Sequence, residues 1–350
     1  MKNVLLPVKI LNKIIAIAQS ALSYSSKNTI SDVTSKILSL DYSYLVSHDS
    51  FISLYRNYIS TGNFSSLYKS DIQSQVVNFP SYGAYFYSKL SSIAYDSCLY
   101  IGAHAFENCS ALEYAQFLHC NIIDSYAFAS CSKLYSYSFP ECIAMKDFVF
   151  KDCDNLVVAS FPKCEEMGNY AFMGCNNLEQ VYMPKVKSVP YKAFQQCHYL
   201  SSVAIADCTY VDDYAFDYCD MLHDMNMLRC SIIGNYAFRS CALSSVSLPN
   251  CCVIGEGAFC NCEYLEYISL ANCSCIGNLA FGNCTYLSEV RLMSNKPVDL
   301  LGPDIFKGTM FDKNNASASI GKLYVPYELY SYYREKWASF INIGTLAIIA

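Results

Sequence analysis

One motif recurs along most of this sequence at an almost constant interval, and that interval limits the possible folds. A Phe, usually in an Ala-Phe pair, recurs every 22 residues with one interval of 21, and a Cys follows three residues after each Phe. The pairs are Phe106/Cys109, Phe128/Cys131, Phe150/Cys153, Phe172/Cys175, Phe194/Cys197, Phe216/Cys219, Phe238/Cys241, Phe259/Cys262 and Phe281/Cys284. A unit this short cannot bury its own apolar residues, so neighbouring units must stack in register. The repeat therefore predicts a solenoid.

Each unit also contains a segment that alternates like a short strand. A Leu follows most of the ladder Phe residues, and apolar residues stand three and five positions beyond that Leu, as in Val181 and Met183 after Leu178. This period of two is typical of a half-buried strand. A turn, often opened by Pro, an aliphatic residue and frequently a Gly lead back to the next Ala-Phe. We expect about nine coils of 22 residues, each with one short parallel strand on a common face.

A second column of cysteines lies eleven residues out of phase with the first, and Val186 fills its one missing place. Its members are Cys98, Cys120, Cys142, Cys164, Cys208, Cys230, Cys251 and Cys273. One small side chain per coil at a fixed corner favours buried, reduced thiols, because free Cys is among the most buried residue types. Disulfides and a metal site are the alternatives, since stacked Cα atoms lie within disulfide range. The run from Cys251 to Cys284 contains no C-x-x-C pair, so a zinc site is not expected there.

The stretch "IGNYAFRSCALSSVSLPNCCVIGEGAFCNCEYLEYISLANC" resembles the BspA-like, or Treponema pallidum type, leucine-rich repeat. The resemblance implies an α/β-type leucine-rich repeat solenoid over residues 81–292. It also implies a helical leader over 1–45, an irregular N-terminal cap over 46–80, and a degenerate coil with a strand and helix cap over 293–350. The family is linked with attachment of bacteria and some protists to host proteins or other cells.

Charge and motif content exclude several classes of function. With 24 Lys plus Arg against 30 Asp plus Glu, the net charge of −6 lacks the basic excess that nucleic-acid binding needs. No run approaches the roughly 20 apolar residues that span a bilayer. The histidines are His48, His104, His119, His198 and His223, which are never paired at helical spacing. We find no nucleophile, phosphate-binding or metal motif. The sequence therefore predicts a protein that is not an enzyme and has no cofactor or metal.

Two sets of residues are candidates for a binding surface. Tyrosines precede Ala-Phe in several coils, where they shield the Phe layer or contact a partner; they are Tyr126, Tyr170, Tyr214 and Tyr236. Outward positions of the predicted strands supply Gln180, Tyr182, Asp224, Asn226, Tyr267, Glu289 and Arg291. We expect a protein or cell-surface ligand. A bacteriophage tail-associated structural or host-recognition protein is the alternative, because the N-terminus lacks a convincing signal peptide; the localisation is open between cell surface, secreted and virion.

Overall fold

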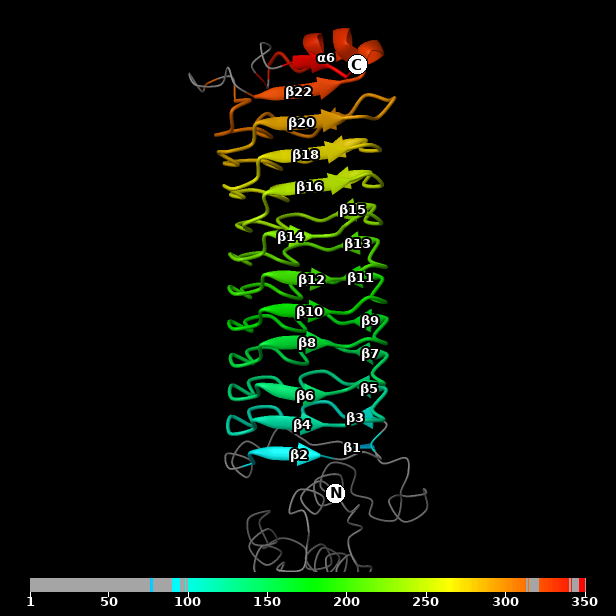
Figure 1. Ribbon diagram of the computed structural model, residues 1–350, viewed down its shortest axis with the longest axis vertical. Coiled ribbons are helices and arrows are strands. Elements are labelled where there is room, and N and C mark those ends of the chain that lie inside the picture. Colours follow the sequence, from blue (N-terminus) through cyan, green and yellow to red (C-terminus); the bar gives the residue numbers. More distant parts are fainter. Residues whose placement is uncertain are drawn as a thin grey trace, which may run out of the picture.

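The computed structural model describes residues 76–77, 90–94, 98, 100–312, 314, 321–339, 341 and 346–349. They form a β-solenoid of about 11 turns, in which parallel strands stack in two long columns (Figure 1). The expected helical leader, and most of the expected N-terminal cap, lie outside the described residues. The predicted stack of 22-residue coils is confirmed, and it continues past the nine coils of the sequence pattern at both ends.

One column of strands, which we call the wide face, is built from the predicted strand segments. It consists of β2 (Ser92–Ala94), β4 (Tyr114–Gln116), β6 (Ser136–Ser138), β8 (Val158–Ser160), β10 (Gln180–Tyr182), β12 (Ser202–Ala204), β14 (Asp224–Met225), β16 (Ser245–Leu248), β18 (Tyr267–Leu270), β20 (Glu289–Leu292) and β22 (Lys322–Val325). Pairing keeps the repeat register, so that Val181 lies between Ala159 and Val203. Alternation puts the apolar side chains inside and leaves the other set in solvent.

The other column, the return face, contains two-residue strands. They are β1 (Val76–Val77), β3 (Tyr100–Ile101), β5 (Ile122–Ile123), β7 (Ala144–Met145), β9 (Glu166–Met167), β11 (Ser188–Val189), β13 (Tyr210–Val211), β15 (Ile232–Ile233), β17 (Val253–Ile254), β19 (Cys275–Ile276) and β21 (Asp299–Leu300). The Ala-Phe segments that follow are turns and not helices. The α/β label is therefore not confirmed, and the described solenoid is a β-structure.

The Ala-Phe segments turn by means of left-handed residues. Positive φ angles occur two residues before and two residues after the ladder Phe, for example at Lys192 with 55° and Gln196 with 63°. The alternation of left- and right-handed residues aims every second N–H at the next coil. Phe194 thus donates to the Ala215 carbonyl, and Gln196 donates to the Asp217 carbonyl, both at 2.8 Å. The turns therefore join coils by hydrogen bonds much as the strands do.

Phenylalanine rings fill the space between the two faces. The ladder Phe rings from Phe106 to Phe306 stack with centroids 5.0 to 5.8 Å apart. Inward residues of the wide face complement one another in volume: Ala115 is followed by Phe117 in an early coil, and Val181 by Met183 further along. When one inward residue of a coil is small, the other is large, so the interior volume of each coil is filled to a similar extent, as close packing requires.

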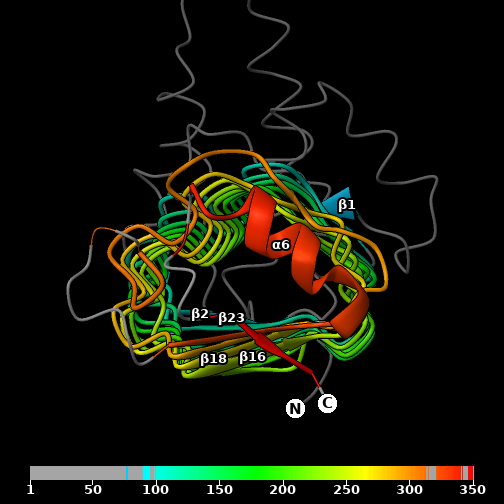
Figure 2. The ribbon, with the colours of Figure 1, turned by 90° about the horizontal axis from the view of Figure 1, so that it is seen from above.

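The C-terminal end of the stack is closed by a strand and a helix. A 3-10 turn η3 (Tyr327–Leu329) leads from β22 into α6 (Tyr330–Lys336), which lies across the open core (Figure 2). Tyr333 is fully buried, and its hydroxyl accepts the N–H of Val298 at 3.1 Å. Strand β23 (Leu346–Ile348) then pairs with β22. The closure covers apolar side chains that the last coil would otherwise expose.

Candidate functional site

The first cysteine column bonds each coil to the one before it. From Cys131 to Cys284 its thiols donate to the carbonyl of the ladder Phe 24 or 25 residues earlier, at 3.0 to 3.2 Å, as Cys219 does to Phe194. The same carbonyl also accepts the N–H of Cys197 at 3.2 Å. Both lone pairs of a buried carbonyl are therefore used, which avoids the cost of an unsatisfied acceptor.

The second cysteine column acts within a coil. Each thiol donates to the carbonyl two residues ahead at 3.2 to 3.4 Å, as Cys208 does to Tyr210. The described cysteines are all free, and all are buried except Cys252, which is exposed, and Cys275, which is intermediate. Burial raises the pKa of Cys120 and Cys262 to about 12, so neither forms a thiolate at neutral pH.

The tyrosines before Ala-Phe form part of a continuous aromatic row. Tyr126 stacks on Phe148 at 4.5 Å, Phe148 stacks on Tyr170 at 4.4 Å, and Tyr214 stacks on Tyr236 at 5.3 Å. Tyr126 and Phe148 are stacked on both faces, whereas Tyr191 meets Tyr170 and Tyr214 edge to face, at 5.3 and 6.0 Å. The row ends at Gly257, where a Cβ would lie 2.3 Å from the Tyr236 ring. The geometry accounts for these tyrosines as packing residues, and their recognition role stays a prediction.

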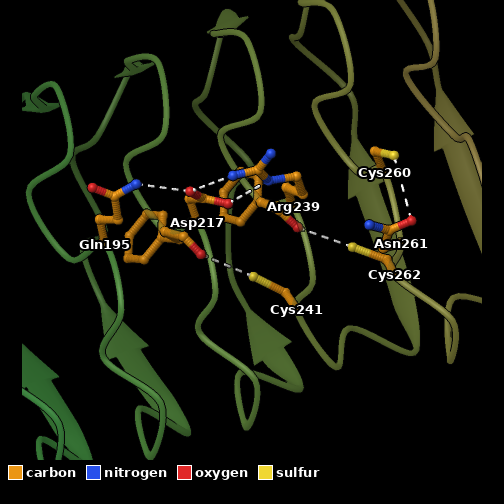
Figure 3. A network of polar contacts seen from close by, with 9 residues as sticks. Gln195, Asp217, Arg239, Cys241, Cys260, Asn261 and Cys262 are labelled. Carbon is orange, nitrogen blue, oxygen red and sulfur yellow. Dashed lines mark hydrogen bonds and ion pairs between the residues drawn. The ribbon is translucent and has the colours of Figure 1, made fainter. Parts of the chain in front are cut away.

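A polar network crosses three coils beside this row (Figure 3). Asp217 is 0% exposed, yet its carboxylate accepts two hydrogen bonds from Arg239, at 2.7 and 2.9 Å, and one from Gln195 at 2.8 Å. The guanidinium lies over the rings of Tyr214, Tyr218 and Tyr236, at 5.8, 4.8 and 5.2 Å from their centroids. Because the buried carboxylate accepts hydrogen bonds at both of its oxygens, its charge is paired, and the network joins three coils.

The predicted outward residues do lie on the wide face, but on separate strands. Gln180 and Tyr182 project from β10, with Tyr182 49% exposed. Asp224 is exposed at the start of β14, and the Asn226 side chain accepts the N–H of Leu228 at 3.2 Å. The residues predicted from the strand pattern therefore share one face without converging on one point.

Tyr267, Glu289 and Arg291 are brought together near the C-terminal end. Arg291 donates to Glu289 at 2.6 Å, and its guanidinium lies 5.9 Å from the Tyr267 centroid and 5.2 Å from that of Tyr324. Tyr324 faces Arg291 in the register of β20 and β22. Tyr267 from the coil before and Tyr324 from the coil after thus lie near the cation, while a carboxylate accepts its Nε–H.

One exposed column was not among the predicted site residues. The position just before the Leu of a coil carries large exposed side chains in four coils of the C-terminal half, and Ala242 in the coil between them. We call these four residues the tyrosine edge: Tyr199, Met221, Tyr264 and Tyr286, 52 to 61% exposed. The equivalent residues in earlier coils are Ala111, Lys133, Asn155 and Asn177. The change from small or polar to large apolar residues is visible in the printed sequence once the repeats are aligned.

No cluster of three or more His, Cys, Asp or Glu suited to a metal ion occurs among the described residues. His104 contacts Glu107 at 2.8 Å and His198 contacts Asp220 at 2.7 Å, so the imidazoles lie in separate surface pairs. A shallow cavity of about 360 Å³ beside the C-terminal closure is lined by residues that include Asp299 and Lys336, without a convergent set of reactive groups. Within the part of the chain that the structure describes, no helix has the length and apolar character to cross a membrane.

The sequence and the fold were compared with those of known proteins. No curated protein matches the sequence. Among solved structures, a leucine-rich repeat protein from Bacteroides ovatus is 20% identical, covers 79% of this chain and 87% of its own, and gives a TM-score of 0.49. A leucine-rich cell surface protein from Faecalibacterium prausnitzii is also 20% identical, with 79% and 81% covered and a TM-score of 0.42. The leucine-rich repeat protein of T. pallidum is 21% identical, with 61% and 78% covered and a TM-score of 0.28.

The family model of the BspA type leucine-rich repeat region matches this chain in 6 copies, over residues 48–135, 100–223, 144–266 and 226–326. These matches span well over half of the sequence and include the Ala-Phe turns, the cysteine columns and the wide-face strands. The chain belongs to the BspA-type leucine-rich repeat family.

Proposed function

We propose that this protein is a non-enzymatic binding protein whose wide face contacts a protein or cell-surface ligand in an adhesion-like role. The observation that carries the proposal is the wide face itself, a long column of parallel strands in three successive sheets whose outward side chains are fixed by coil stacking. Large side chains such as Tyr182 and Val158 are exposed on it, at 49% and 43%. Rigid, half-exposed aromatic residues are common anchors of protein interfaces. The name of the Faecalibacterium structure, a cell surface protein, is consistent with this role.

A direct test compares variants of the two faces. Labelled full-length protein is applied to bacterial and cultured epithelial cells, and bound label is measured by flow cytometry. Tyr182→Ala combined with Ala204→Glu places a charge in the middle of the wide face, where both residues are exposed. Ile143→Glu is the matched change at an exposed residue beside the return face. We expect the wide-face variant to lose binding and the control to keep it; equal binding by both contradicts the proposal.

A bacteriophage tail-associated role is the second candidate, and the free thiols favour it. Buried cysteines without disulfides fit a chain that folds where thiols stay reduced, as virion proteins do before lysis. Neighbouring genes for tail, baseplate or lysis proteins would support this candidate. Neighbouring genes for sortase or secretion components would favour the adhesion-like role.

A further inference from the structure

The tyrosine edge differs from the rest of the aromatic surface because its rings are uncovered. Tyr126 and Tyr170 have rings of neighbouring coils on their faces. Among the described residues, no ring contact and no side-chain hydrogen bond is found for Tyr199, Tyr264 or Tyr286. Tyr264 and Tyr286 are 61% and 57% exposed, although they belong to adjacent coils whose backbones bond through Tyr286 N–H and Glu263 O at 3.3 Å. Their faces are available to a partner.

Charge around Tyr264 is also left unbalanced, whereas beside Tyr199 the side chains of His198 and Asp220 pair at 2.7 Å. Glu263 and Glu266 flank Tyr264, both are exposed, and neither forms an ion pair with a described residue. On the opposite edge of the wide face, charges are neutralised between coils: Asp207 pairs with Lys187 at 3.0 Å and with Arg229 at 2.9 Å. The part of the tyrosine edge around Tyr264 and Tyr286 therefore favours a cationic partner, and the opposite edge shows no such preference.

The same molecule shows twice how such a set of groups holds a guanidinium. Arg291 lies against Tyr267 and Tyr324 while Glu289 accepts its N–H, and Arg239 lies among three tyrosines while Asp217 accepts its N–H. In both cases two or more tyrosine rings have their centroids 4.8 to 5.9 Å from the guanidinium, and a carboxylate accepts its N–H. Tyr264, Tyr286 and Glu266 provide the same kinds of group on adjacent coils, and no described cation of the chain lies over either ring.

We infer that the tyrosine edge binds an arginine-bearing segment of a partner protein, with a guanidinium against Tyr264 and Tyr286 and its N–H groups directed to Glu266. The inference rests on the proposed function and names the chemistry of its partner. Tyr199 and Met221 form a second station three coils away, about 14 Å at the spacing of parallel strands. An extended peptide covers that span in about four residues. A segment with two long basic side chains at that separation therefore fits both stations.

Fluorescence anisotropy with the full-length chain tests the site. The probe is a labelled peptide of about nine residues with two arginines about four residues apart, and the matched peptide carries neutral citrulline in their place. We expect the Tyr264→Ala, Tyr286→Ala double variant to weaken binding about tenfold, since two cation–π contacts are lost. Glu266→Gln should weaken it severalfold. Asn155→Ala, in the same column of an earlier coil, should leave the dissociation constant unchanged.

Because all of these residues are exposed, we expect each variant to be folded. Circular dichroism and thermal melting check this. Equal affinity for the arginine and citrulline peptides, or an unchanged dissociation constant in the double variant, overturns the inference. So does a self-association that the double variant abolishes, since the edge would then be occupied by a second copy. If the double variant still binds cells while the Tyr182 variant does not, the proposed function stands and this inference fails. If the protein binds the peptide but binds no cell, the proposed function is wrong and this inference stands.

Discussion

At the scale of the residue, the ladder Phe stabilises the stack because its ring contacts rings of the coils before and after it. Phe194 is 0% exposed and stacks on Phe172 at 5.3 Å and on Phe216 at 5.2 Å. Phe194→Ala should reduce the free energy of unfolding by about 3 to 5 kcal/mol, through lost burial and a cavity. Urea denaturation measures the loss. Tyr199→Ala, at an exposed ring, should cost below about 0.5 kcal/mol; similar losses for the two variants contradict the stacking arrangement.

The two cysteine columns should differ in their tolerance of substitution. Val186 occupies the place of a second-column Cys and is fully buried, so Cys208→Val should cost less than about 1.5 kcal/mol. Both changes remove one thiol hydrogen bond, but the Cys219 bond joins neighbouring coils and no first-column position carries Val, so Cys219→Val should cost about 1 kcal/mol more. Chemical denaturation of both variants checks the difference. Equal losses would mean that the thiol bond between coils adds nothing to stability.

Much of this residue-level arrangement is predictable from the sequence. The period places the ladder Phe and both cysteine columns in the interior, because a fixed position in a stacked coil has a fixed environment. The partners of the thiols are not predictable, since they depend on left-handed turns whose residues are as different as Lys192, Tyr214 and Ser240. A left-handed conformation costs a residue with a side chain about 1 to 2 kcal/mol. Hydrogen bonds between coils offset this cost, so the turns need no particular residue type.

At the scale of the element, the turns and strands are joined between coils by both backbone and side-chain contacts. Asp217→Ala should destabilise the protein by about 3 to 5 kcal/mol, because it leaves Arg239 and Gln195 without their buried acceptor. Lys163→Ala removes an ion pair with Glu141 whose two side chains are partly exposed, and it should cost below about 1 kcal/mol. Thermal denaturation of the two variants measures both. A mild effect of Asp217→Ala would show that the pair is solvated.

The sequence pattern predicts a continuous wide face, whereas the structure divides it into three sheets. One break, between β6 and β8, lies at Tyr137, whose hydroxyl accepts the N–H of Ser160 at 2.8 Å. The other, between β14 and β16, coincides with the coil that is one residue shorter before Leu243. The pattern of apolar residues does not predict such local changes in strand pairing. The tyrosine edge was missed for a related reason, because exposure at a corner depends on turn geometry.

At the scale of the whole molecule, the many buried thiols should lower the free energy of unfolding as the pH becomes alkaline. Burial raises the pKa of Cys120, Cys230, Cys262 and Cys273 from 9.0 to about 12. Because these pKa values are higher in the folded state, their contribution is complete below about pH 9 and is lost as the pH rises from about 9 through 12. Each thiol should then reduce the free energy of unfolding by about 1.4 kcal/mol per pH unit.

Urea midpoints measured between about pH 7 and pH 10 test this dependence. We expect a plateau up to about pH 8.5 and a steep decline above it. A variant with Cys120 and Cys230 both replaced by Val should decline less steeply, because two of the ionising groups are absent. The same slope in both proteins would assign the alkaline loss to other groups, such as the tyrosines.

The central claim is that stacked coils bury the cysteine columns as reduced packing residues, and a thiol count tests it most directly. Purified protein without reductant is treated with a thiol reagent, first native and then denatured. We predict that Cys252 and, more slowly, Cys275 react in the native protein, and that all 20 thiols react after denaturation. Rapid reaction of many thiols in the native state, or a total well below 20 after denaturation, would contradict the account.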